Sequence, residues 1–338
     1  MYYDIDRNGW TVIPNALPEV KDEIVLKNIN ETLKRRKFEY ITDALYMAKK
    51  KWNIDPEDTR HVCGEFDTLQ LNDDNLVDDY VAEYLYKYGL SFVICTLNYH
   101  IVDRPEVFIY VPFNQVMNIH RINTVMFELA TSQRLGQIAA ELLRQDKVRL
   151  YQTALFSKDH HGLNLQTEWH RDLNMAPINA KEGGSLTFWC PVYRRLDRQQ
   201  GDSMLRFLGG SHRDISQKNW YHGVADMKSR YGGYGQARTL EVGDCTVHHG
   251  WVLHYAPPQL KTSQFQDRLA IGFTYVAGDA TVLTDLYGQD TNSHRRATFG
   301  DEDEYSYRDW IKDLSEGDVI DHPLLPLVFD AHSAASLG

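Results

Sequence analysis

Two side chains that commonly bind metal ions lie two residues apart in the segment Thr167–Asn174, which reads TEWHRDLN. If this segment is a β-strand, His170 and Asp172 project from the same face, with backbones about 7 Å apart. An imidazole and a carboxylate at that separation can reach one ion, each at about 2.0–2.2 Å. The pair alone is a weak signal, because a solvated strand end would look the same. A metal site needs another ligand elsewhere in the chain.

A histidine-rich segment, Gly243–His254 (GDCTVHHGWVLH), supplies three candidates for that ligand. In a continuous strand, His248 and His254 share one face and His249 takes the other. Gly250 can interrupt this alternation with a bulge. The spacing therefore does not decide which of the three histidines would join the first pair.

An arginine follows this segment at a position that could bring it back to the same place. After a turn at 256–258 (APP), Arg268 opens the apolar run 268–276 (RLAIGFTYV). If the two strands pair as a hairpin, Arg268 returns beside His254. A planar guanidinium binds a carboxylate in bidentate fashion. An arginine here is therefore suited to hold one end of a dicarboxylate whose other end chelates the metal.

The composition limits the class of protein. The chain has 338 residues, a net charge of −11 and four widely spaced cysteines. The acidic balance argues against nucleic-acid binding and against docking on an anionic membrane. The cysteine spacing indicates thiols in a reducing compartment, not a zinc or disulfide framework. With no run of about 18 apolar residues and no signal-peptide pattern, we expect a cytoplasmic protein. We also expect a monomer or homodimer.

The predicted secondary structure that positions these residues changes at about Val148, from mainly helices to short strands. Before it, a short strand is expected at 9–14, and amphipathic helices are expected within 17–38 and over 132–143, the second capped by Ser132. Segment 39–87 is charged and aromatic, with helical pieces. After Val148, short apolar runs separated by turn signals predict a β-sandwich or barrel. These runs are 148–156, 164–175, 185–193, 204–210, 237–256 and 268–277.

Together, these segments resemble the phytanoyl-CoA dioxygenase family of non-haem iron(II), 2-oxoglutarate-dependent oxygenases. The opening, Asp6–Pro14, is similar to the family's start. Further similar segments are Val148–Gln152 with Lys158, Trp169–Asp172, Leu186–Pro191, Phe207–His212, and Gly243–His254 followed by Arg268. The likeness covers most of the chain and is strongest from Val148 to Val276.

The resemblance assigns roles to individual residues. It implies that the iron ligands, and thus the catalytic residues, are His170, Asp172 and His254. It implies that Arg268 anchors the distal carboxylate of 2-oxoglutarate and that Trp189 lines the cosubstrate pocket, where we also place Lys158.

The resemblance also implies the fold. We expect a mainly β protein with α additions, in which a double-stranded β-helix (jelly roll, cupin-like) core is flanked by N-terminal helices. Residues 1–338 would form a single catalytic domain. It would consist of a helix-rich part (1–147), the jelly-roll core (148–280) and a C-terminal segment that wraps the core (281–338).

The implied reaction uses Fe(II), 2-oxoglutarate and O₂ to oxidise an unactivated C–H bond, with release of succinate and CO₂. The carboxylate of Asp172 favours hydroxylation, desaturation or oxidative ring closure, because related halogenases have a small residue there. We expect a small metabolite of the natural-product tailoring type as substrate. The alternatives are an acyl-CoA or lipid hydroxylase and a non-catalytic jelly roll that binds a metal or ligand. Arg268 favours the enzymes, because a binding module needs no cosubstrate anchor.

Other basic side chains are given structural roles. We expect His248 and His249 to support or pack near the site, and His212 to support a turn. The loop 193–198 (YRRLDR) carries Arg194, Arg195 and Arg198, which could bind a substrate carboxylate or phosphate, but a solvated loop is the expected role.

Overall fold

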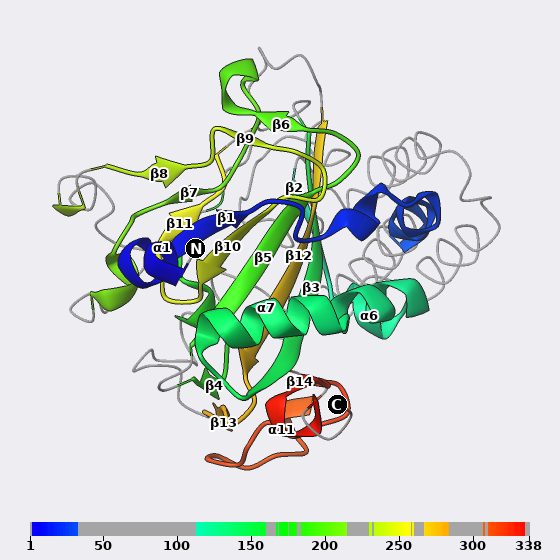
Figure 1. Cartoon of the computed structure of the whole chain (residues 1–338), viewed down its shortest axis with the longest axis vertical. Helices are drawn as coiled ribbons and strands as arrows, with labels where there is room; N and C mark the ends of the chain where they lie inside the picture. The colour runs from blue at the N-terminus through cyan, green and yellow to red at the C-terminus, as the bar shows by residue number, and fades with distance from the viewer. Residues whose placement is uncertain are drawn as a thin grey trace, which may run out of the picture.

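A computed structural model of the chain (Figure 1) describes residues 2–32, 113–159, 167, 169–174, 176–180, 184–214, 230–231, 233–257, 259, 267–283, 307 and 310–334. This part of the chain is mainly β. Its strands form one large antiparallel sheet, one small sheet and two strand pairs. No helix in it is long and apolar enough to cross a membrane.

The major sheet has the order β1-β10-β5-β12-β3-β14, and β2 also pairs with β3. Its strands are β1 (Trp10–Ile13), β2 (Phe113–Met117), β3 (Lys147–Asp159), β5 (Ser185–Pro191), β10 (Cys245–His249), β12 (Asp267–Ala277) and β14 (Leu327–Asp330). The expected N-terminal part thus contributes β1 and β2 to this sheet, and the expected C-terminal wrap contributes β14.

The minor sheet has the order β11-β7-β8. Its strands are β11 (His254–Tyr255), β7 (Arg206–Phe207) and β8 (Gly235–Gln236); the separate pairs are β4 (Ile178–Asn179) with β13 (Thr281–Val282), and β6 (Leu196–Asp197) with β9 (Thr239–Leu240). The two sheets pack against each other, because Trp189 and Ala270 of the major sheet share one buried cluster with Phe207 of the minor sheet.

Two helices, α6 (Thr124–Ala130) and α7 (Gln133–Leu143), pack on the other face of the major sheet. The helix α1 (Tyr2–Asn8) contacts β1, and α11 (Ala331–Ala334) follows β14. Residues 23–32 are also helical, within the segment 17–38 where a helix was expected. The 3₁₀ turns are η1 (Pro18–Lys21), η3 (Ile119–Arg121), η4 (Asp172–Asn174), η5 (Arg198–Gln200) and η6 (Ser211–Arg213). Figure 1 shows α7 lying across the sheet. The predicted helix over 132–143 is confirmed: Ser132 caps α7 by accepting from the backbone N–H of Leu135, and Leu135 and Ala139 pack in the core.

Strand alternation divides the side chains of the major sheet between its two faces. On β5, Phe188 and Cys190 pack toward the helices, whereas Trp189 packs between the sheets. On β12, Phe273 and Tyr275 likewise join the helix-side core. The alternate positions therefore face the space between the sheets, and they include Thr187, His248, Arg268 and Thr274.

The mainly β fold predicted from the sequence is confirmed. The runs 148–156, 185–193 and 268–277 become β3, β5 and β12, and the run 237–256 divides into β9, β10 and β11. The strand predicted around His170 is wrong for its described residues. His170 forms only an isolated bridge, and Asp172 begins η4. Segment 39–87 lies outside the described residues.

Candidate metal centre

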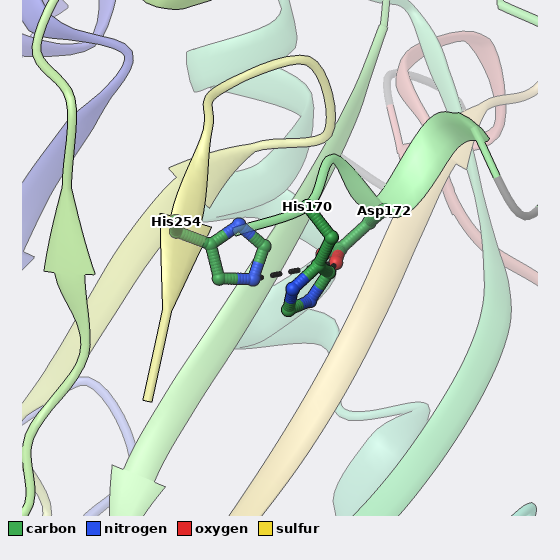
Figure 2. A group of neighbouring side chains, drawn as sticks. All are labelled: His170, Asp172 and His254. Carbon is green, nitrogen blue, oxygen red and sulfur yellow. Dashed lines mark ion pairs between the residues drawn. The ribbon is translucent and has the colours of Figure 1, made fainter. Parts of the chain in front are cut away.

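His170, Asp172 and His254 lie together, with one potential ligand atom from each all within 4.8 Å of one another. The Oδ1 atom of Asp172 is 3.6 Å from Nε2 of His170 and 3.4 Å from Nε2 of His254. Figure 2 shows the two imidazoles and the carboxylate pointing toward one another. Ligands at about 2.1 Å from one ion lie about 3.0–3.4 Å apart for angles between octahedral and tetrahedral. The two distances from Asp172, 3.4 and 3.6 Å, are close to this range, so the three side chains are placed to bind one ion.

The backbone brings the two histidines together. His170 and His254 form an antiparallel bridge in which each backbone N–H donates to the other's carbonyl, both at 3.0 Å. Their ring centroids lie 4.2 Å apart. Asp172 lies two residues beyond His170, where η4 begins. A bridge therefore joins the two histidines, and Asp172 is placed at the start of a 3₁₀ turn, not on the strand that the sequence predicted.

The surroundings of His254 keep its metal-facing nitrogen unprotonated. Its Nδ1 lies 3.2 Å from the carbonyl oxygen of Val252, which can only accept a hydrogen bond. Nδ1 therefore donates, and Nε2 keeps its lone pair toward Asp172. Burial, then the neighbouring His170, lowers the pKa of His254 well below its usual value. A neutral imidazole is the form that binds a metal ion.

The hydrogen bonds that described side chains make to the carboxylate of Asp172 all fall on one oxygen, Oδ2. Thr187 donates from Oγ1 to Oδ2 at 2.8 Å, and Nε2 of His248 lies 3.2 Å from the same atom. Burial opposes ionisation, but the three histidines, with His254 the strongest, hold the pKa of Asp172 well below its usual range. The group thus stays anionic, as a metal ligand must be.

The three histidines of segment 243–254 are separated by the fold. His254 joins the triad, and His248 contacts the carboxylate. His249 turns away: its Nδ1 accepts from the backbone N–H of Trp251 at 3.1 Å, and its ring lies 5.5 Å from that of His212. Sequence reasoning placed His248 near the site but did not find its contact with Asp172, nor the role of Thr187. The shared phase of His248 and His254 was the available signal.

Arg268 reaches the space between the sheets from the major sheet. The hairpin predicted between its strand and that of His254 is wrong, because β12 pairs with β3 and β5 whereas β11 pairs with β7. Arg268 is 1% exposed, and its guanidinium carbon lies 5.0 Å from the ring centroid of Trp189. Among the described residues, none of its three nitrogens has a hydrogen-bond partner.

A buried guanidinium without a partner is costly, so it needs an explanation. Burial, then the charge of Arg194, lowers the pKa of Arg268 to about 9. An anionic ligand at this place would satisfy it. Arg268, beside Trp189, is therefore a candidate anion-binding residue.

Lys158 lies opposite Arg268 in the register of β3 and β12. Its ammonium donates to the carbonyl oxygens of Ala256 at 2.8 Å and Pro257 at 2.7 Å. Lys158 thus fixes the segment that follows β11, and this role was not foreseen from the sequence. Burial, then the charge of Arg268, lowers the pKa of Lys158.

The basic loop is occupied by internal ion pairs. Arg194 makes two hydrogen bonds to the buried carboxylate of Asp202, at 2.9 and 3.0 Å. Arg195 pairs with Asp197 at 3.0 Å and with Glu241 at 3.3 Å. Arg198 is exposed in η5. These contacts fit the expected structural role of the loop.

A model of the family described as phytanoyl-CoA dioxygenase (PhyH) matches residues 5–264. No match was found among curated proteins. Solved structures do match. The non-heme alpha ketoglutarate dependent carbocyclase SnoK from nogalamycin biosynthesis has a TM-score of 0.56 at 18% identity, covering 96% of this chain and 94% of SnoK.

The non-heme alpha ketoglutarate dependent epimerase SnoN from nogalamycin biosynthesis gives a TM-score of 0.54 at 16% identity, covering 97% of this chain and 96% of SnoN. A complex of SnoN with Fe3+, alpha ketoglutarate and nogalamycin RO gives 0.51 at 15% identity, with the same coverage. At these identities the likeness supports the fold.

Proposed function

Since the chain belongs to the phytanoyl-CoA dioxygenase family, matched over residues 5–264, we propose that its site binds Fe(II) and 2-oxoglutarate through the residues described above. Membership makes the chain a 2-oxoglutarate-dependent oxygenase. We further propose which residues take part in the reaction and which class of substrate is oxidised.

The donor set fits iron. Two neutral imidazoles, His170 and His254, and the carboxylate of Asp172 form the two-histidine, one-carboxylate triad that holds Fe(II) on one face and leaves positions open. Iron bound there supplies O₂ activation coupled to the oxidative decarboxylation of 2-oxoglutarate to succinate and CO₂. The hydrogen bonds on His254 and Asp172 fix which atoms face the ion.

The observation that carries the proposal is the buried guanidinium of Arg268, whose three nitrogens have no hydrogen-bond partner in the described part of the chain. Its guanidinium carbon lies 5.0 Å from the ring centroid of Trp189, which shares a buried cluster with Phe207. The ring centroid of Phe207 lies 6.1 Å from that of His254, so this cluster connects Arg268 to the triad. The planar fork of Arg268 binds the distal carboxylate of 2-oxoglutarate in bidentate fashion, and the 2-oxo acid end chelates the metal. A jelly roll that only bound a metal would not need this buried charge.

Exposure indicates where the substrate approaches. The side chains of His170 and Asp172 are 16% and 17% exposed, whereas that of His254 is 5% exposed. The site thus opens on the side of His170 and Asp172. The cosubstrate anchor is closed to solvent, since Arg268 is 1% exposed, which excludes water from that end.

We place the substrate among small metabolites that are hydroxylated, desaturated or oxidatively cyclised. Asp172 fills the ligand position that a halide would need, so halogenation is not proposed. An acyl-CoA or other lipid is the second candidate, supported by the activity for which the family is named.

The test is 2-oxoglutarate turnover by the purified chain with Fe(II), followed as succinate release. A panel of small-metabolite acids, amines and polyketides is compared with a panel of acyl-CoA thioesters. Stimulation by one panel identifies the substrate class. Succinate release that is as fast in Asp172→Ala as in the wild type would contradict the assigned triad.

A further inference from the structure

We propose that His248 is a positioning residue that, with Thr187, holds Oδ2 of Asp172 and makes the carboxylate bind iron through Oδ1 alone. The inference rests on the proposed function, because it concerns the same metal site. His248 itself touches neither the metal nor the cosubstrate in this account.

The two oxygens of Asp172 have separate partners. Oδ2 lies 2.8 Å from Oγ1 of Thr187 and 3.2 Å from Nε2 of His248. Oδ1 faces the Nε2 atoms of His254 and His170 at 3.4 and 3.6 Å. One oxygen is therefore held by donors from the sheet, and the other is turned toward the two imidazoles.

The direction of each hydrogen bond follows from the chemistry of the atoms. An ionised carboxylate only accepts, so Thr187 and His248 both donate to it. The hydroxyl of Thr187 donates its one hydrogen bond to Asp172. The hydroxyl oxygen of Thr187 then accepts a hydrogen bond from Oγ1 of Thr274 at 3.1 Å. His248 donates from Nε2, which leaves Nδ1 as the acceptor nitrogen, and Nδ1 has no partner among the described residues.

The major sheet makes this arrangement rigid. Trp10, His248, Thr187 and Thr274 lie in register across the neighbouring strands β1, β10, β5 and β12. His248 is 1% exposed, and its ring lies 5.3 Å from that of Phe207. The donors are thus fixed by central strands, whereas Asp172 lies at the start of a short 3₁₀ turn and needs external support.

One-oxygen binding matters because of the number of positions at the metal. A triad that uses one atom from each residue leaves three positions on an octahedral ion, enough for a bidentate 2-oxo acid and O₂. A carboxylate bound through both oxygens would occupy one of them. Hydrogen-bond partners of ligands commonly contribute about 10- to 100-fold to metal affinity.

The competing role for His248 is that of a fourth ligand. The group of side chains whose ligand atoms all lie within 4.8 Å contains His170, Asp172 and His254 but not His248. Nε2 of His248 lies at hydrogen-bond distance from Oδ2 of Asp172. A nitrogen that donates its N–H to this oxygen has no lone pair for a metal ion.

The test measures metal binding without cosubstrate, using Co(II) as a spectroscopic probe and Fe(II) for affinity. His248→Phe removes the donor and keeps a ring; His248→Gln keeps an N–H. From the other side, Thr187→Val removes a donor and Thr187→Ser keeps it. His249→Phe is the matched control, because the next ring along β10 turns away from Asp172.

We expect His248→Phe and Thr187→Val each to weaken metal affinity by about 10- to 100-fold and to alter the Co(II) ligand-field spectrum. His248→Gln and Thr187→Ser should restore most of both. X-ray absorption should still count two histidine ligands in His248→Phe. Circular dichroism confirms that each variant is folded.

Unchanged affinity and spectrum in both His248→Phe and Thr187→Val would overturn the inference. Loss of one histidine ligand in His248→Phe would also overturn it, by making His248 a ligand. Failure of the wild-type chain to bind Co(II) or Fe(II) is a different result, because it contradicts the proposed function itself.

Discussion

Replacing Arg268 by methionine removes a buried positive charge and keeps a side chain of similar length. In the wild type, this guanidinium is 1% exposed and has no hydrogen-bond partner among the described residues. When 2-oxoglutarate binds, the guanidinium and the distal carboxylate form a buried pair. Losing one partner of such a pair costs about 2–5 kcal/mol, because the other charge is left unpaired.

At about 1.4 kcal/mol per tenfold change, that cost raises the Kd of 2-oxoglutarate by roughly 30- to 4,000-fold. In the ligand-free protein, the same substitution should not reduce stability. Burial lowers the pKa of Arg268 to about 9, so the charged guanidinium destabilises the folded protein relative to the unfolded chain, and this cost is fully present below about pH 9. Arg268→Met should therefore keep or raise the melting temperature of the ligand-free protein.

The assay is anaerobic calorimetry of 2-oxoglutarate binding to the iron-loaded protein, with a thermal melt of the ligand-free protein beside it. Arg198→Met is the matched control, because this arginine is exposed. Near-normal 2-oxoglutarate affinity in Arg268→Met would refute the anchor. A ligand-free variant that melts well below the wild type would refute the claim that the guanidinium lacks internal partners.

Three further changes have defined outcomes. Asp172→Ala removes the only anionic ligand of the triad and should abolish both iron binding and turnover; equilibrium dialysis with iron analysis checks this. Lys158→Met leaves two buried carbonyls without their donor and should cost about 1–3 kcal/mol of stability, measured by urea unfolding. Burial lowers the pKa of His120 and of His249 to about 4 from 6.5. Their neutral forms therefore stabilise the fold fully above pH 6.5, and this stability should decline as the pH falls from 6.5 toward 4. His120→Phe and His249→Phe should each flatten that decline in urea midpoints, and an unchanged slope would contradict the assignment.

The residue types of the site were readable from the sequence, but the reason they meet was not. His170 and His254 are joined by a backbone bridge between segments 84 positions apart (254 − 170), and no local pattern encodes that pairing. Asp172 begins a 3₁₀ turn and does not lie on a strand. The predicted closeness of His170 and Asp172 is therefore correct, but the conformation from which it was predicted is wrong.

The strand alternation predicted for segment 243–254 also placed residues near the site for the wrong structural reason. His248 and His254 were expected on one face of one strand. They instead lie on β10 and β11, in two different sheets, and approach Asp172 from both. Gly250 lies between these strands, and a Cβ there would lie 2.0 Å from Oγ of Ser185, so the chain bends where only glycine fits.

Long-range partners were the other limit. The arginines of loop 193–198 could have faced a substrate, and nothing in the sequence assigned the carboxylate of Asp202 to Arg194. The amphipathic pattern of 132–143 was sufficient for α7, because a capping serine and one apolar face are local signals. Local sequence patterns were therefore sufficient to predict helices and strands. The contacts between side chains distant in sequence could be identified only from the structure.

The most direct test of the account is an anaerobic titration of the purified chain with Fe(II), followed by 2-oxoglutarate, while the weak visible metal-to-ligand charge-transfer band is recorded. We expect the band to form in the wild type and in Arg198→Met, and to be lost in Asp172→Ala. In Arg268→Met it should need far more 2-oxoglutarate. If Fe(II) binds and no band forms at any 2-oxoglutarate concentration, the chain holds a metal without its cosubstrate, and the central claim is wrong.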